Sequence, residues 1–156
     1  MLDKKELIIL AKLRENSRES LTRMSRKISI PVSTIYEKLK NYEKTVIKKH
    51  TSLLDFNKLG FGTRATIILK SKKENRENLK QFLLENKYVN SFYKINNGYD
   101  FMIETVFREL KEVENFVEEL ENNYGVEEKL VYYIVEELKK EAFLSNADYI
   151  KVSGNI

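Results

Sequence analysis

The sequence predicts an α+β protein with two domains, a helical one followed by one in which strands and helices alternate. Up to residue 46, apolar residues recur every three or four positions, as on one face of a helix; beyond residue 62, such stretches alternate with stretches of period two, which are typical of strands. The charge divides in the same place. Residues 1–50 contain 13 Lys and Arg against 6 Asp and Glu, and residues 51–156 contain 15 against 18.

Composition limits what the chain can do. Its 156 residues, 42% of them hydrophobic, are enough for two modest cores. It has no cysteine, which excludes disulfides and thiolate chemistry, and one histidine, His50, which we interpret as a polar surface residue. We therefore expect no metal, no cofactor and no catalytic site. Neither a signal-like start nor an apolar run of membrane-spanning length is present, so the expected location is the cytoplasm.

Three helices are predicted within residues 1–45. Asp3 and Glu6 match a capping box that opens a first helix ending near Asn16. Ser20 suits the N-cap of a second helix, and Pro31 suits the first turn of a third. The apolar stripes of the second and third helices consist of Leu21, Met24, Ile28, Val32, Ile35, Leu39, Tyr42 and Val46. Two helices joined by so short a turn form a helix-turn-helix.

The third helix has a polar face opposite its apolar stripe. Its hydroxyl, amide, carboxylate and ammonium groups can hydrogen-bond base edges or contact phosphates in a major groove. Because residues 17–49 contain 9 basic and 3 acidic residues, we expect binding to double-stranded DNA. The alternative is an ordinary solvated helix face. The candidate DNA-binding residues are Arg18, Ser20, Lys27, Ser33, Thr34, Tyr36, Glu37, Lys38, Lys40, Asn41 and Lys44.

Residues 46–62 are predicted to form an arm strand and a linker. The stretch from Thr45 to Leu54 is β-branched at its start and apolar at its end, which favours an extended strand over more helix. Gly60 and Gly62 then mark a domain boundary.

Residues 63–140 show the order strand, helix, strand, strand, helix, strand. The two central strands, 89–96 and 100–107, are separated by Asn97-Gly98, a strong hairpin signal. This order is the ferredoxin-like βαββαβ pattern, an antiparallel sheet with both helices on one face. Residues 141–156 are predicted to form a C-terminal tail.

Side-chain alternation assigns the two faces of the sheet. One face of the first central strand is predicted to hold Val89, Ser91, Tyr93 and Ile95. The face without helices would expose Tyr93, Phe101 and Tyr132 together, a patch that monomers avoid. Self-association is therefore expected, as a two-fold dimer.

The chain resembles the Lrp/AsnC regulators over roughly residues 2–140. The resemblance rests on Asn16-Ser17-Arg18 with Ser20, on Ile47–Asp55, on Lys58-Leu59-Gly60-Phe61 and on Asn97-Gly98-Tyr99-Asp100-Phe101, in that order and spacing. It implies a winged helix-turn-helix that binds DNA and a RAM/ACT-like ferredoxin domain that dimerises and assembles further, to a tetramer or octamer. It also implies an amino-acid effector bound between subunits, at Asn97, Gly98, Tyr99 and Asp100.

Several residues depart from the family pattern. Ser29 occupies the position of a turn glycine, where a left-handed backbone would cost of the order of 1 kcal/mol. Lys38 and Lys40 occupy positions where arginines are common, and Asn97 stands at a usual glycine.

Three alternatives stay open. The same two-domain plan occurs in sirohaem decarboxylases, although the C-terminal half here has no histidine and few arginines. An architectural protein could bind DNA through phosphates with little sequence preference. Asp100 could cap the hairpin turn instead of binding an effector.

Overall fold

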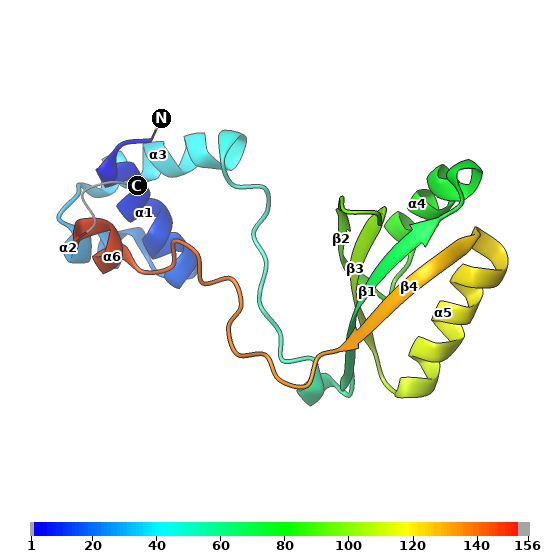
Figure 1. Ribbon diagram of the computed structural model, residues 1–156. Helices are drawn as coiled ribbons and strands as arrows, with labels where there is room; N and C mark the ends of the chain where they lie inside the picture. The colour runs from blue at the N-terminus through cyan, green and yellow to red at the C-terminus, as the bar shows by residue number, and fades with distance from the viewer. Residues whose placement is uncertain (1, 153–156) are drawn as a thin grey trace. The chain divides into compact units, whose positions relative to one another are not determined.

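The computed structural model describes residues 2–152 and divides the chain into two compact units, Met1–Ser52 with Leu138–Ile156 and Leu53–Glu137. The first unit is helical and the second contains the sheet (Figure 1). The predicted α+β class and the order of elements are confirmed. Among residues 2–152, every helix is too short or too polar to cross a lipid bilayer.

The helical unit contains α1 (Lys4–Glu15), α2 (Leu21–Ile28), α3 (Val32–Thr45) and α6 (Ala147–Val152). The predicted capping box starts α1: Asp3 Oδ1 accepts a hydrogen bond from the Glu6 N–H at 2.8 Å, and Glu6 Oε2 accepts one from the Asp3 N–H at 2.9 Å. The core of the unit consists of Ile9, Leu10, Met24, Ile30, Ile35 and Tyr42. These residues come from all three N-terminal helices and the turn after α2, so the apolar stripes meet in one core. Val32 and Val46, which we predicted as part of these stripes, are exposed instead.

The turn between α2 and α3 has the strain that its sequence implies. Ser29 ends α2 with φ 56° and ψ 41°, a left-handed conformation. Pro31 follows as the N-cap of α3, where the missing N–H costs no helical hydrogen bond. No wing hairpin follows α3 in the described chain, so helices are the only regular elements of this unit among its described residues.

The C-terminal segment does not form the separate tail that we predicted for residues 141–156. Ala147 and Ile150 of α6 are buried against Ala11 of α1, in a small cluster of their own. The described part of the tail therefore belongs to the helical unit, because it covers the apolar side of α1 that α2 and α3 leave open. Residues 153–156 lie outside the described part of the chain.

The predicted arm is not a strand within this chain. α3 continues through Thr45, and no described residue pairs with residues 47–55 as a neighbouring strand. An isolated strand has no ladder hydrogen bonds to hold it, so a segment of this composition needs a partner strand from elsewhere.

The second unit is a four-stranded antiparallel sheet in the order β2-β3-β1-β4 (Figure 1). The strands are β1 (Thr63–Ser71), β2 (Val89–Lys94), β3 (Phe101–Phe107) and β4 (Val126–Tyr133). Two longer helices, α4 (Arg76–Glu85) and α5 (Leu110–Tyr124), pack on one face, and two short 3-10 turns are η1 (Asn57–Leu59) and η2 (Lys73–Asn75). The predicted βαββαβ architecture is confirmed.

The predicted single face of Val89, Ser91, Tyr93 and Ile95 on β2 is wrong. A bulge between Val89 and Ser91 shifts the register, so Phe92 lies opposite Ile103 and packs edge-on to Phe101, with 5.2 Å between ring centroids. Val89 and Phe92 thus face the helices, whereas Tyr93 faces away. Phe101 is also buried, 3% exposed, and does not belong to the open face where we expected it.

The open face of the sheet still exposes large apolar side chains. Tyr93 is 46% exposed and Tyr132 is 54% exposed. Tyr132 lies opposite Thr66 on β1, one position out of phase with the buried Ala65 and Ile67, so it points away from the helices.

Candidate DNA interface and effector site

The polar face of α3 is exposed as the sequence predicts. Ser33, Thr34 and Glu37 lie in its N-terminal half, and Asn41 and Lys44 in its C-terminal half; all are exposed. Their side chains have no ion-pair partner among residues 2–152, so their polar groups are available to a ligand. Helix N-terminal residues of a helix-turn-helix can reach base edges, while cations further along can reach phosphates.

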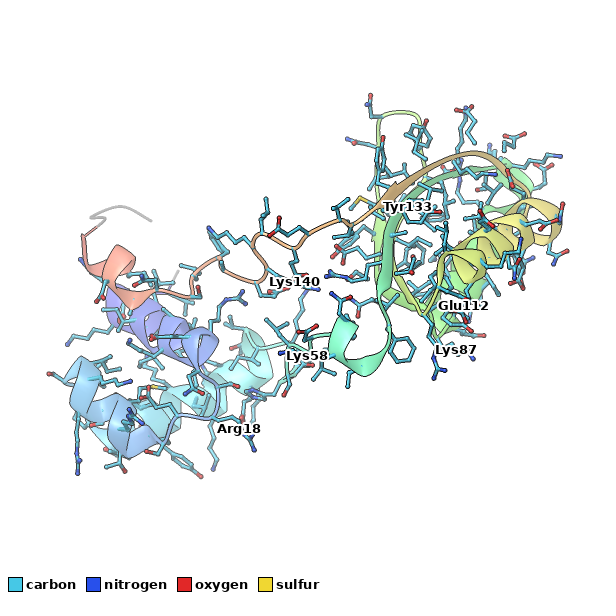
Figure 2. The ribbon with its side chains drawn as sticks, turned by 90° about the horizontal axis from the view of Figure 1, so that it is seen from below. Arg18, Lys58, Lys87, Glu112, Tyr133 and Lys140 are labelled. Atoms are coloured by element: carbon cyan, nitrogen blue, oxygen red, sulfur yellow. The ribbon has the colours of Figure 1, made fainter. Side chains whose placement is uncertain are left out.

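Tyr36 and Lys40 form a pair on this face. The Lys40 ammonium lies 5.2 Å from the centroid of the Tyr36 ring, and Tyr36 is 51% exposed. The ring holds the ammonium near the helix without neutralising its charge. Arg18, labelled in Figure 2, comes from the loop between α1 and α2 and is also exposed.

Lys38 points to a partner within the chain. Its Nζ lies 2.6 Å from Oε1 of Glu6, whose side chain is 14% exposed. The hydrogen bond to Lys38 lowers the pKa of the Glu6 carboxyl, and the hydrogen bond to Glu6 raises the pKa of Lys38. This pair ties α3 to the first turn of α1, so the Lys38 charge is not free for phosphate.

Tyr42 lies on the buried side of α3. It is fully buried, and its hydroxyl has no hydrogen-bond partner in the described part of the chain. Burial raises its pKa to about 12, and the nearby Glu6 carboxylate acts in the same direction. Tyr42 therefore stays neutral at physiological pH.

Two further predicted DNA-binding residues have roles inside the helical unit. Ser20 Oγ accepts a hydrogen bond from the Arg23 N–H at 3.3 Å and caps α2. Lys27 Nζ lies 2.5 Å from Oε1 of Glu19, and the hydrogen bond from Lys27 lowers the pKa of that carboxyl. Arg26 is exposed and makes no ion pair with any described residue. We did not predict it as a DNA-binding residue; the excess of basic residues in this part of the chain was the one signal that included it.

The predicted effector turn has the backbone that Asn-Gly implies. Asn97 has φ 66° and Gly98 has φ 87°, as a type I′ turn requires at both central positions. The Ile95 N–H donates to the Asp100 carbonyl at 3.0 Å and closes the loop. Asn97 and Gly98 are exposed, while Tyr99 and Asp100 are half-buried.

The Asp100 carboxylate is already bound from three directions. Oδ2 accepts hydrogen bonds from the Ser71 N–H at 2.9 Å and from Ser71 Oγ at 3.2 Å, and Oδ1 lies 2.7 Å from an Arg76 guanidinium nitrogen. The Asp100 side chain is 12% exposed and that of Arg76 is 44% exposed. The group that this site presents to solvent is therefore the guanidinium. Sequence reasoning missed Arg76 and Ser71, because neither is near Asp100 in the chain.

Comparison with known proteins decides the family. Residues 64–143 match the family model described as the Lrp/AsnC ligand binding domain. The chain belongs to the Lrp/AsnC family. The transcriptional regulator AzlB of Bacillus subtilis is 31% identical over 121 residues, 75% of this chain and 77% of AzlB. An uncharacterised HTH-type transcriptional regulator of Pyrococcus furiosus is 29% identical over 141 residues, 90% of this chain and 93% of that protein.

Solved structures show the same fold for this Lrp/AsnC protein. Bacillus subtilis LrpC has a TM-score of 0.81 at 23% identity, covering 89% of this chain and 98% of LrpC. A transcriptional regulator of Neisseria meningitidis, solved as a complex with L-Met, has a TM-score of 0.83 at 23% identity, covering 90% and 94%. The family match and the similar regulators make the chain an HTH-type transcriptional regulator with a ligand-binding domain. The family is one of regulators and not of enzymes, so the prediction that this chain is not an enzyme is confirmed.

Proposed function

We propose that this Lrp/AsnC regulator is a homodimer that binds specific DNA sites through the exposed face of α3 and responds to an amino acid bound between subunits. The observation that best supports DNA binding through α3 is that its two sides differ in which polar groups are available to a ligand. Lys38 is paired with Glu6 and Tyr42 is buried, while Ser33, Glu37 and Lys40 are exposed without ion pairs to described residues.

The DNA-binding side chains separate into two kinds. Ser33, Thr34 and Glu37 lie near the N-terminus of α3, where a recognition helix meets base edges. Lys40 and Lys44 lie further along and would contact phosphates, which adds affinity but little sequence information.

Selection from a random DNA pool followed by binding measurements in a salt series tests this assignment. Lys40→Ala and Lys44→Ala should each lower the log–log salt slope by about 0.9 for each phosphate that is no longer neutralised, and by twice that in a symmetric dimer. Ser33→Ala and Glu37→Ala should change the selected sequence instead. Lys73→Ala, on η2 of the other unit, is the matched control and should change neither.

Two results would contradict the DNA proposal. Salt slopes and selected sequences that all four α3 variants leave unchanged would remove α3 from the interface. A parent protein that selects no sequence at all would favour an architectural role, in which binding depends on phosphates alone.

The effector proposal rests on the charge pair beside the Asn97-Gly98 turn. Arg76 presents a guanidinium to solvent, and Asp100 fixes its position. A guanidinium can bind an α-carboxylate with two hydrogen bonds, and the turn offers backbone groups for the rest of the ligand. The Neisseria regulator with bound L-Met supports an amino acid as the class of effector.

Thermal shift and sedimentation with each of the common amino acids test this effector site. At least one should raise the melting temperature of the parent or change its oligomer size, because a ligand that bridges subunits favours one assembly. Asp100→Asn should abolish the shift, and Asp55→Asn, in the linker, should keep it. If no amino acid shifts the parent, the effector proposal is wrong.

A further inference from the structure

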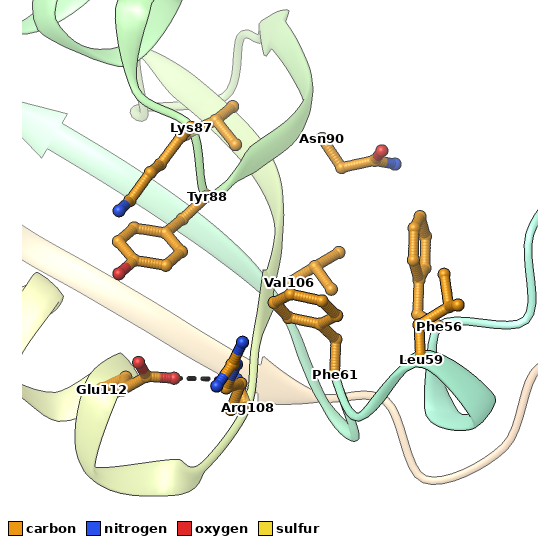
Figure 3. A pocket seen from close by; sticks show the side chains of 10 residues that line it. Phe56, Leu59, Phe61, Lys87, Tyr88, Asn90, Val106, Arg108 and Glu112 are labelled. Atoms are coloured by element: carbon orange, nitrogen blue, oxygen red, sulfur yellow. Dashed lines mark hydrogen bonds between the residues drawn. The ribbon is translucent and has the colours of Figure 1, made fainter.

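The second unit contains a pocket that lies away from the Asn97-Gly98 turn, at the opposite ends of β2 and β3. Its volume is about 530 Å³, within the range of small-molecule sites. Figure 3 shows Phe61 and Arg108 in its middle, with Lys87 and Tyr88 on one side and Phe56 and Leu59 on the other.

The walls of the pocket are apolar and aromatic. Tyr88 is held in place by stacking on Phe107, with 4.6 Å between ring centroids, so one wall is fixed to the core. Phe61 and Val106 also line the pocket, as does Leu59 of η1, which is 56% exposed. A planar or branched apolar group would remove these surfaces from water.

Two cations lie at this pocket, each beside an aromatic ring. The Lys87 ammonium is 5.0 Å from the Tyr88 ring centroid, and the Arg108 guanidinium carbon is 5.3 Å from the Phe61 centroid. Neither side chain makes an ion pair with any residue that the structure describes. The positive charges of Lys87 and Arg108 therefore line the pocket without a carboxylate from the described residues to neutralise them.

Glu112 does not supply that anion. Its Oε2 accepts a hydrogen bond from the backbone N–H of Arg108 at 2.8 Å (Figure 3). It also accepts one from the backbone N–H of Glu109 at 3.3 Å, at the start of α5. The carboxylate is thus committed to the helix terminus. Its remaining charge still repels a ligand with several negative charges, such as a phosphate ester, and tolerates one with a single charge.

We propose that this pocket binds a small monocarboxylate with an apolar body, at a site separate from the effector turn. The carboxylate contacts Lys87 and Arg108, and the apolar body lies against Phe61 and Val106. Both α-amino acids and 2-oxo acids have this chemistry. They differ in the α-ammonium group, which Glu112 can attract.

Calorimetric titration of the full-length protein with four probes tests the proposal. The probes are L-phenylalanine, phenylpyruvate, 3-phenylpropionate and the neutral 3-phenylpropanol. At least one acid should bind, and the neutral alcohol should bind about tenfold more weakly, since it has no charge-assisted hydrogen bond. Tighter binding of phenylalanine than of phenylpyruvate would assign the ligand to the amino acids, and the reverse order to the oxo acids.

Variants locate the binding site. Arg108→Gln and Lys87→Gln should each weaken acid binding by about tenfold, and both side chains are at the surface, so folding should be unaffected. Lys94→Gln, an exposed lysine on β2 outside the pocket, is the control. Asp100→Asn should leave this binding intact, which separates it from the effector site.

Three results would overturn the proposal outright, and a fourth would move the ligand to the other site. The three are no binding of any acid at millimolar concentration, equal binding of 3-phenylpropanol, and acid affinity that the double variant of Lys87 and Arg108 leaves unchanged. Loss of binding in Asp100→Asn alone would place the ligand at the turn. It would then support the proposed effector site while removing this one.

Discussion

The ammonium of Lys38 on α3 lies 2.6 Å from the carboxylate of Glu6 on α1, and Glu6 at the same time accepts the N–H of Asp3 that caps α1. One carboxylate thus connects the start of the first helix to the middle of the helix assigned to DNA recognition. This contact joins α3 to α1 beside the core that packs the two helices together.

The Glu6–Lys38 pair should make stability depend on pH at both ends of the range. Because folding lowers the Glu6 pKa from 4.5, its contribution is present above pH 4.5 and is lost as pH falls through the lowered value. Because folding raises the Lys38 pKa from 10.5, that contribution is present below pH 10.5 and is lost as pH rises through the raised value. Glu6→Gln should remove both effects in denaturant unfolding.

Glu37→Gln is the control for this measurement, since Glu37 is exposed on α3 next to Lys38 and has no ion-pair partner in the described chain. A stability difference between parent and Glu6→Gln that stays constant down to pH 2 would show that the Glu6 charge does not stabilise the fold.

Ser29→Gly should stabilise the helical unit. Ser29 has φ 56°, which glycine adopts without the steric cost of a Cβ, and the gain should be about 1 kcal/mol, reduced by the larger entropy of glycine in the unfolded chain. Ser25→Gly, in the middle of α2, should instead destabilise by about 0.5–1 kcal/mol. Urea unfolding of both variants measures the difference, and equal effects would contradict strain at Ser29.

Asp100→Ala should destabilise the sheet unit by about 2 kcal/mol, because it leaves the Ser71 hydrogen-bonding groups without an acceptor in a site that is nearly closed to water. Arg76→Ala should cost less than about 1 kcal/mol, since its guanidinium is 44% exposed. Thermal unfolding of both variants gives the order. If Arg76→Ala lowers stability more than Asp100→Ala does, the hydrogen bonds with Ser71 are not the main contribution of Asp100.

Ile150→Ala should destabilise the helical unit by about 2 kcal/mol, because Ile150 is 3% exposed against α1. Val135→Ala, at a residue that is 98% exposed, should change stability by less than about 0.5 kcal/mol. Amide hydrogen exchange provides a second measurement, in which the α1 amides should exchange faster in Ile150→Ala than in the parent. Unchanged exchange and stability would mean that α6 does not contribute to this unit in solution.

If the proposed dimer forms through the open face of the sheet, Tyr132→Glu should convert it to a monomer. Tyr132 points from the open face of the sheet and is 54% exposed, so a carboxylate there would be buried in a face-to-face dimer. Tyr133→Glu is a control with the same change on the neighbouring residue, which lies opposite Ala65 and so on the other side of the sheet. Sedimentation equilibrium distinguishes the two, and a parent that sediments as a monomer at micromolar concentration would exclude this interface.

The sequence by itself determined the local features of this protein. Periodicity located α1 to α5 and β1 to β4, Asp3 with Glu6 started α1, and Asn97-Gly98 closed the hairpin, because these signals act between residues close in the chain. The arm strand was predicted wrongly and α6 was not predicted. The position of Ser29 in a left-handed turn was also local, since the short turn before Pro31 leaves few other conformations.

Only the tertiary structure decided which polar groups remain free for partners. From the sequence, Lys38 was predicted to bind DNA and Asp100 to bind an effector. In the structure each already has a partner that is distant in the chain: Glu6, 32 residues from Lys38, and Ser71, 29 residues from Asp100. The bulge beside Asn90 that turns Phe92 inward and the packing of Ile150 on α1 likewise depend on long-range contacts. Periodicity assigns a side chain to a face of its own element, whereas the partner that meets that face is set by how distant elements pack.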